Sequence, residues 1–187
     1  MGNNQHGHHK GNSTEMLLDK ERILKELNIQ PGQSIIDAGC GNGYMAMEFS
    51  QLVNNTGKVY ALDQSQEAIE ILKNKTKGTN ISPIKADITR ETGINDSSID
   101  LIYLSTVYHI FSNQKKETFQ NEVKRLLRPN GRLAMVEIEK KETPMGPPQN
   151  MRVSPEEMKN LIEMEPIALV KVGEYFYMQI FEKREID

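Results

Sequence analysis

Short apolar runs alternate along the chain with longer stretches whose apolar residues recur at roughly helical spacing. The runs predict strands, and the near-continuous run at 99–104 is typical of a parallel strand that is buried on both faces. The expected strands are 34–37, 58–63, 81–86, 99–104, 132–138, 167–172 and 175–181. Strands that alternate with helices predict a doubly wound α/β fold with a mostly parallel sheet.

Capping and breaking residues mark where the intervening helices begin and end. Ser65 and Asn113 are placed to cap two helices, while Gly78 and the segment 129–131 end them. Ser154 opens a capping box with proline at the first helical position. The expected helices cover 15–27, 45–52, 65–77, 113–127 and a segment from 154 onward.

The last two predicted strands are separated by Gly173 and Glu174 alone. A linker this short forces an antiparallel hairpin, because a parallel crossover needs about a dozen residues. A dinucleotide-binding fold would place a further parallel strand here. The end of the chain therefore departs from that fold.

Three alternating glycines follow the first predicted strand, in the segment 35–43 with the sequence Ile-Ile-Asp-Ala-Gly-Cys-Gly-Asn-Gly. Gly39, Gly41 and Gly43 allow a tight turn and the close approach of a ligand. Asp63 ends the next strand about twenty residues later, where a carboxylate can accept hydrogen bonds from ribose hydroxyls. The pattern predicts a nucleoside-binding crevice at the carboxyl ends of parallel strands.

Two cofactor classes compete for this crevice, NAD and S-adenosylmethionine. The dinucleotide pattern counted from Gly39 fails at Tyr44, whereas a looser form fits from Gly41 to Ala46. Asp37 favours S-adenosylmethionine, because a carboxylate beside the loop would repel a pyrophosphate and attract a sulfonium and an ammonium group. The structural alternative is that Asp37 caps the strand end and the glycines form an ordinary turn.

Composition narrows the classes of partner. The 187 residues carry 23 Lys plus Arg against 26 Asp plus Glu, so no basic excess indicates a nucleic-acid partner. No apolar run approaches a membrane span and the N-terminal segment lacks the apolar core of a signal peptide, so we expect a cytoplasmic protein with no membrane partner. We expect a flexible arm at 1–14, one domain at 15–187, and a monomer or homodimer.

Two features could suggest a metal site. The histidine-rich segment 6–10 lies within the expected arm, where it contributes solubility or adventitious affinity, or folds over the cofactor pocket. Cys40 is the only cysteine, which rules out an intramolecular disulfide and argues against a cysteine-based metal site. We interpret Cys40 as a small space-filling residue near the cofactor rather than a nucleophile, and we expect no metal.

Together these motifs resemble those of the class I S-adenosylmethionine-dependent methyltransferases, in particular the small type related to the ubiquinone and menaquinone biosynthesis methyltransferases. The segments that carry the resemblance are 37–43, Asp63, 86–88 and 126–133, with Asn130 where glycine is usual. The resemblance spans roughly 23–181 and implies a seven-stranded Rossmann-like sheet whose last strand is reversed, which agrees with the predicted hairpin.

The resemblance also implies roles for the residues that follow the first two strands. Gly39, Gly41 and Gly43 would face the methionyl and ribose parts of S-adenosylmethionine. Asp63 would bond the ribose hydroxyls, and Gln64 would lie beside the adenine.

Three further residues are implied in the same way. Asp87 would accept a hydrogen bond from the adenine amino group, and Ile88 would pack on the adenine ring. Ser105 would lie near the methionyl group and the transferable methyl. The structural alternatives are a turn cap for Asp87 and a plain strand-end residue for Ser105.

Catalysis needs few residues, because methyl transfer from a sulfonium is an in-line displacement with a good leaving group, although a weak nucleophile would also need a base. His109 is the weak candidate for that base; the alternative is that it starts a helix or packs against other side chains.

Glu137 and Glu139 would bind a cationic acceptor or be solvated strand-end charges, and we favour solvated charges. The proline-containing segment 145–152 is a candidate acceptor lid or a subunit contact.

The leading hypothesis is therefore an S-adenosylmethionine-dependent methyltransferase that acts on a small-molecule acceptor. An NAD-dependent oxidoreductase is the first alternative. A non-catalytic module that keeps the cofactor pocket is the second.

Overall fold

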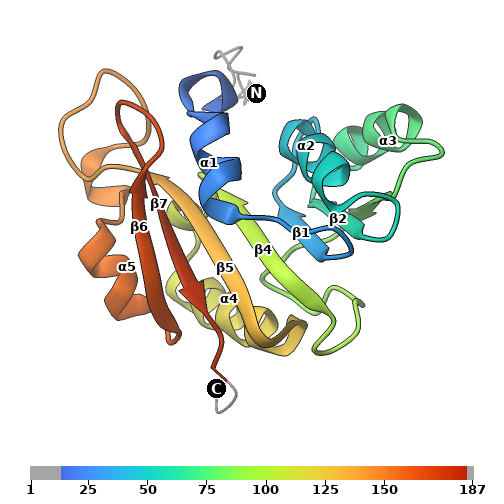
Figure 1. Ribbon diagram of the computed structural model, residues 1–187. Coiled ribbons are helices and arrows are strands. Elements are labelled where there is room, and N and C mark those ends of the chain that lie inside the picture. The colour runs from blue at the N-terminus through green and yellow to red at the C-terminus, as the bar shows by residue number, and fades with distance from the viewer. Residues whose placement is uncertain (1–13, 185–187) are drawn as a thin grey trace, which may run out of the picture.

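A seven-stranded sheet forms the centre of the molecule (Figure 1). The computed structural model describes residues 14–184, so the histidine-rich segment 6–10 lies outside the described residues. The strands are β1 Ser34–Ala38, β2 Lys58–Asp63, β3 Ile81–Lys85, β4 Ile99–Ser105, β5 Leu127–Ile138, β6 Glu165–Lys171 and β7 Phe176–Glu182.

The strand order is β3-β2-β1-β4-β5-β7-β6. The pairs β1–β2, β2–β3, β1–β4 and β4–β5 are parallel, whereas β7 runs antiparallel to both β5 and β6. The mostly parallel sheet, the C-terminal hairpin and the reversed last strand are thereby confirmed. From β1 the chain proceeds to β2 on one side, and from β4 to β5 on the other, so a crevice is expected where β1 and β4 end.

Helices cover both faces of the sheet. They are α1 Lys20–Leu27, α2 Tyr44–Val53, α3 Gln66–Lys75, α4 Asn113–Leu126 and α5 Pro155–Leu161, with short 3-10 helices η1 Thr14–Leu17, η2 Tyr108–Ile110 and η3 Gln149–Met151. One apolar core joins α1, α2 and α3 to the sheet and a second joins α4 and α5 to its other face (Figure 1). The neighbours Ile35 and Ile36 belong to different cores and are both fully buried, which explains the continuous apolar run in β1.

The predicted helix at 15–27 is wrong in its first half. The chain leaves η1 at Leu17, and Leu18 forms an antiparallel bridge with Gly173. The backbone N–H of Asp19 then donates to the carbonyl of Val172 over 2.8 Å, and its side chain caps α1. Helical spacing gave no sign of this break, because the tertiary contact with the β6–β7 connection imposes it.

Two boundaries around α4 also differ from the prediction. Ser112, not Asn113, is the N-cap, and its hydroxyl accepts from Lys115 N. The strand β5 begins at Leu127 rather than 132, and the segment 129–131 lies inside it where the pairing with β4 changes register. Asn130 has φ +62°, a backbone conformation that asparagine tolerates better than most residues, so it can replace a glycine there.

The C-terminal connection is longer than expected. Residues 172–175, rather than two residues, lie between β6 and β7, although the hairpin itself is antiparallel as predicted. Within the described residues, no helix is long and apolar enough to cross a membrane.

Candidate functional site

The glycine loop leaves β1 and leads into α2. Gly39, Gly41 and Gly43 all have positive φ values, of +73°, +50° and +81°. A Cβ atom on Gly39 would lie 2.9 Å from Val107 Cγ2, and one on Gly43 would lie 2.3 Å from Leu72 Cδ1, so packing excludes larger residues at both positions. A Cβ atom on Gly41 would meet no atom within 4 Å. Gly41 therefore faces open space, as a position approached by a ligand should.

Asp63 at the end of β2 holds the glycine loop in place. Its Oδ2 accepts a hydrogen bond from Gly41 N over 2.9 Å, and its Oδ1 accepts from Ser65 N over 2.8 Å. The backbone N–H groups of Gly39 and Cys40 donate to the carbonyl of Leu62. The carboxylate predicted to meet a ribose thus lies beside the most open glycine of the loop.

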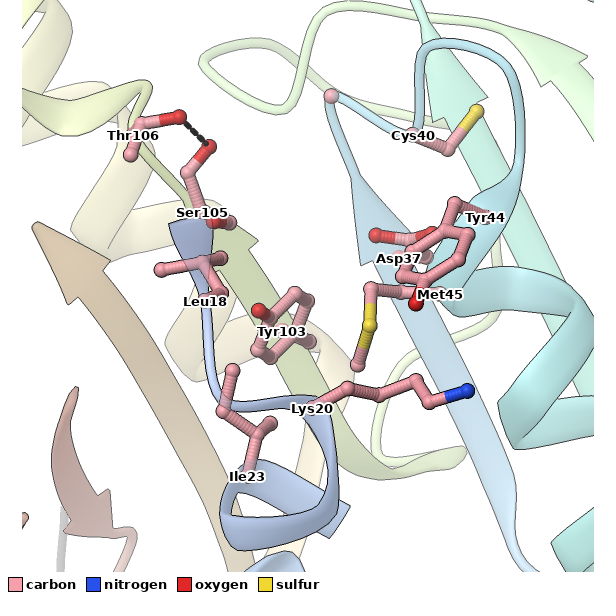
Figure 2. A pocket seen from close by; sticks show the side chains of 11 residues that line it. Leu18, Lys20, Ile23, Asp37, Cys40, Tyr44, Met45, Tyr103, Ser105 and Thr106 are labelled. Atoms are coloured by element: carbon pink, nitrogen blue, oxygen red, sulfur yellow. Dashed lines mark hydrogen bonds between the residues drawn. The ribbon is translucent and has the colours of Figure 1, made fainter. Parts of the chain in front are cut away.

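A cavity of about 160 Å³ lies at the carboxyl ends of β1 and β4, and we call it the glycine-loop cavity. Residues within 18–23, 37–40, 44–45 and 103–106 form its wall. Figure 2 shows Asp37, Tyr44 and Met45 on one side and Leu18, Ser105 and Thr106 on the other, with Tyr103 between them. Of the predicted residues, Asp37, Gly39 and Ser105 meet here, and Asp37 is only 4% exposed.

Lys20 is a wall residue that the sequence did not single out. Its Nζ lies 2.9 Å from Glu48 Oε1 and 5.5 Å from the centre of the Tyr44 ring, so it links α1 to α2 beside the cavity. The hydrogen bond with Glu48 raises the pKa of Lys20. A lysine at the start of a helix gives no local signal of this position, because α1 and α2 are brought together only by the fold.

Cys40 also lines the glycine-loop cavity. Burial raises the pKa of its thiol strongly, and the nearby charges of Asp37 and Asp63 raise it further. A thiol held in its protonated form is a poor nucleophile, which supports the space-filling interpretation. In the part of the chain that the structure describes, no group of three or more His, Cys, Asp or Glu side chains is arranged to hold a metal ion.

A second cavity of about 330 Å³ adjoins the first and shares Thr106 with it. We call it the His109 chamber. Its other wall residues are Leu17, His109, Ile138, Met145, Gly146, Pro147 and Phe176. The N-terminal segment borders both cavities, since Leu18 lines the first and Leu17 the second.

His109 forms a close pair with Glu137. The His109 Nδ1 lies 2.8 Å from Glu137 Oε2, and the His109 backbone N–H donates to Glu137 Oε1 over 3.3 Å. Glu137 is only 1% exposed, so its interpretation as a solvated charge was wrong. Glu139, two residues further on, forms an ion pair with Lys141. Burial raises the pKa of the adjacent Tyr108 to about 12, and the charge of Glu137 adds to the shift.

The residues predicted to contact adenine lie outside both cavity walls. Asp87 Oδ1 accepts from Thr89 N and Oγ1 over 2.9 and 2.7 Å, and its Oδ2 lies 3.1 Å from Lys115 Nζ. Burial alone would raise the pKa of Asp87, but the bonds from Thr89 and Lys115 outweigh it and lower the pKa. Ile88 is buried in the core below α4, and Gln64 is exposed. Their contacts with adenine stay a prediction.

Comparison with known proteins identifies the class. A family model described as a methyltransferase domain matches residues 29–185. The chain belongs to this family and, with its fold, to the class I S-adenosylmethionine-dependent methyltransferases.

The similar proteins agree with this assignment. The crystal structure of an S-adenosylmethionine-dependent methyltransferase from Aquifex aeolicus has a TM-score of 0.81 and 27% identity, covering 92% of this chain and 93% of its own. Demethylmenaquinone methyltransferase from Staphylococcus saprophyticus is 27% identical over 67% of this chain and 53% of its own length. An uncharacterized transposon protein from Streptomyces fradiae is 30% identical over 63% of this chain and 34% of its own length. The chain thus spans about half or less of these curated relatives.

Proposed function

We propose that this protein transfers a methyl group from S-adenosylmethionine to a small-molecule acceptor. The observation that carries the proposal is the buried carboxylate of Asp37 in the glycine-loop cavity, just before the loop in which Gly41 leaves open space. A carboxylate wall suits a sulfonium and an ammonium group, and the open position at Gly41 suits a ligand that approaches the backbone. These residues therefore fit the cofactor.

Each end of the cofactor has candidate partners in this chain. Asp37 would bind the methionyl ammonium group, and Lys20 would bind the methionyl carboxylate in place of Glu48. Asp63 would accept from the ribose hydroxyls, since a carboxylate has acceptor positions beyond the two bonds it already makes. Gln64, Asp87 and Ile88 are the candidates for the adenine end.

S-adenosylmethionine supplies a methyl group on a positively charged sulfur that becomes a neutral thioether when the methyl leaves. The protein's part is to align the acceptor and to exclude water, which can contribute up to about 7–11 kcal/mol. Thr106, which follows β4, lies where the glycine-loop cavity meets the His109 chamber, and Ser105 before it lines the glycine-loop cavity. An acceptor held in the chamber would approach the methyl group across this junction.

An NAD-dependent oxidoreductase is poorly supported. The strand β7 runs antiparallel beside β5, whereas the dinucleotide-binding order places parallel strands throughout. The Asn42 side chain already accepts from Tyr44 N at the start of α2, where a pyrophosphate would need free N–H groups.

Calorimetry tests the cofactor assignment directly. The wild-type protein should bind S-adenosylhomocysteine, and Asp63→Asn should weaken that binding about tenfold, because a charged hydrogen bond contributes about 1.5–3 kcal/mol. Asp100→Asn is the matched control, since Asp100 also accepts from a backbone N–H, that of Ser34, but at the amino ends of the strands. Tight NAD binding without a response to S-adenosylhomocysteine would reject the proposal.

Turnover separates the enzyme from a non-catalytic module. We expect S-adenosylhomocysteine to be released from S-adenosylmethionine in the presence of a small-molecule acceptor. A protein that binds the cofactor but methylates no member of a broad metabolite panel would favour a binding module. Mass measurement in solution would distinguish between the two expected states, a monomer and a homodimer.

A further inference from the structure

The wall of the His109 chamber has a different set of side chains from the wall of the glycine-loop cavity. Five of its eight described wall residues, Leu17, Ile138, Met145, Pro147 and Phe176, have apolar side chains, and Thr106 and His109 add polar groups. Within the described residues, this wall contains no lysine, arginine, aspartate or glutamate. Its volume of about 330 Å³ lies at the small end of the range of about 300–1,000 Å³ typical of ligand pockets.

His109 is the titratable side chain of this wall. Its Nδ1 is engaged by Glu137 Oε2 at 2.8 Å, which leaves Nε2 as the nitrogen that can meet a ligand. The Glu137 carboxylate also accepts from the His109 backbone N–H, so both the ring and the chain of His109 are fixed by one buried group. A carboxylate behind an imidazole sets its tautomer and stabilises the imidazolium that forms when it takes a proton.

The fold places this pair beside the junction of the two cavities. Ser105 on β4 pairs with Val136 on β5, and Thr106 N donates to Val136 O over 2.8 Å. Glu137 comes directly after Val136, which pairs with the last residue of β4. His109 lies three positions after Thr106, so the chain brings both members of the pair to this strand end. The pair lies next to the residue shared by both cavities, within the region where the acceptor must sit.

We propose that the His109 chamber binds an uncharged acceptor whose nucleophile is a hydroxyl group, with His109 as its general base and Glu137 as the positioning residue. This inference rests on the proposed methyl transfer and names the class of acceptor for it. The hydroxyl proton moves to His109 Nε2 and from there to water. The electron pair left on oxygen forms the new oxygen–carbon bond, while the pair of the carbon–sulfur bond stays on sulfur.

The surroundings of His109 favour this class over a cationic acceptor. Glu137 is already committed to His109, and Glu139 is paired with Lys141. Tyr108, whose pKa is raised, stays neutral near pH 7 and offers no second negative charge. A cation in the chamber would lose its hydration with no carboxylate left to replace it.

The test uses 4-nitrophenol, whose ionised form absorbs at a longer wavelength than its neutral form. The full-length wild-type protein is loaded with S-adenosylhomocysteine, so that no transfer occurs, and the spectrum of the bound probe is recorded at constant pH. We expect the ratio of ionised to neutral probe to rise about tenfold over that of the free probe, a shift of about one pKa unit. In His109→Gln the probe should still bind, but the ratio should return to within about twofold of the free value.

Glu137→Gln should also lower the ratio of ionised to neutral bound probe, as His109→Gln does. Circular dichroism would show whether the fold tolerates this substitution of a buried residue. Glu139→Gln is the matched control, because it removes a carboxylate from the same strand end without touching His109, and the ratio should be unchanged. The cation 4-nitrobenzylammonium should bind at least about tenfold more weakly than 4-nitrophenol.

Different results would contradict different parts of the proposal. An ionised fraction that is the same in His109→Gln and wild type would overturn the base assignment. Absence of 4-nitrophenol binding, or preference for the cation, would overturn the acceptor class. Absence of S-adenosylhomocysteine binding by the wild type, measured without any probe, would instead reject the proposed function itself.

Discussion

The glycine-loop cavity and the His109 chamber meet at Thr106, yet their walls are chemically different. The first contains a buried carboxylate, Asp37, and a lysine, Lys20. The described wall of the second contains no lysine, arginine, aspartate or glutamate, and its titratable side chain is His109, with Glu137 behind it. Charged groups select a charged ligand, whereas a wall without charged side chains and with one proton acceptor selects by shape and protonation. The contrast therefore indicates two ligands of opposite character that meet at one point.

The two cavities also differ in how the chain builds them. Much of the first comes from one continuous segment, 37–45, in which φ values and backbone bonds fix the loop. The second is assembled from Leu17, His109, Ile138 and Phe176, which come from four different parts of the chain. Thr106 joins them with φ +55°, a strained value for a threonine, which is typical of functional sites.

The largest effect should come from filling the open position in the glycine loop. Gly41→Ala places a methyl group where no atom beyond its own chain neighbours lies within 4 Å and where we expect the cofactor. A steric conflict of about 2–3 kcal/mol should weaken S-adenosylhomocysteine binding about 30–150-fold, as measured by calorimetry. The His109 chamber should be unaffected, so that 4-nitrophenol still binds.

Gly78→Ala is the control for this substitution. Gly78 also has a positive φ, +79°, and open space around its Cβ position, but it follows α3 and is not part of the glycine loop. Both variants should lose about 1 kcal/mol of unfolding free energy from backbone strain. Equal losses of ligand affinity in the two variants would show that Gly41 acts through stability alone.

The same contrast explains what the sequence could predict. The doubly wound fold class, the C-terminal hairpin and the glycine loop follow from local patterns: apolar runs, capping residues and glycines with a fixed spacing. Asp37 and Ser105 end adjacent parallel strands, so they had to lie near each other once β1 and β4 were recognised as neighbours. Local chemistry was sufficient for Asp37, whereas Ser105 was assigned to the site by the family resemblance.

The chamber could not be predicted in this way. The bridge from Leu18 to Gly173 joins distant parts of the chain, and no periodicity records it. The burial of Glu137 did leave a signal that was missed. It lies between Val136 and Ile138 in a strand that is covered on both faces, where a charge must have a buried partner. That partner, His109, is separated from it by 28 positions and could be found only in the folded chain.

A smaller effect should separate charge recognition from shape in the glycine-loop cavity. Asp37→Asn keeps the size of the side chain but removes its charge. S-adenosylhomocysteine, which carries an ammonium group, should bind about tenfold more weakly, equivalent to about 1.4 kcal/mol. Methylthioadenosine lacks that ammonium group, and its affinity should change less than about twofold when both ligands are titrated by calorimetry. A parallel loss for both ligands would mean that Asp37 acts on the loop and not on the charge of the ligand.

A charge introduced into the wall of the His109 chamber should change ligand affinity by a smaller factor still. Met145 lines the chamber and is 38% exposed, so Met145→Glu should be tolerated by the fold. Repulsion should weaken binding of ionised 4-nitrophenol about fivefold, or about 1 kcal/mol for charges near solvent. Met151→Glu is the control, since Met151 is exposed in the same loop but does not line the chamber. If both substitutions reduce binding alike, the loop acts through its overall charge rather than through the chamber wall.

The smallest effect should come from Asp87, which lies in neither cavity wall. Asp87→Asn keeps the bonds from Thr89 but loses the ion pair with the half-exposed Lys115, which contributes less than about 1 kcal/mol. The pKa of Asp87 is lowered below its ordinary value of 3.8, so the carboxylate stabilises the fold above that value and loses the effect as the pH falls through the lowered pKa. Urea unfolding should therefore show a difference between wild type and variant at pH 7 that diminishes as the pH falls below 3.8. A difference in unfolding free energy that persists in acid would mean that the stabilisation does not come from the charge of Asp87. A loss of S-adenosylhomocysteine affinity at pH 7 would give Asp87 a role in binding as well.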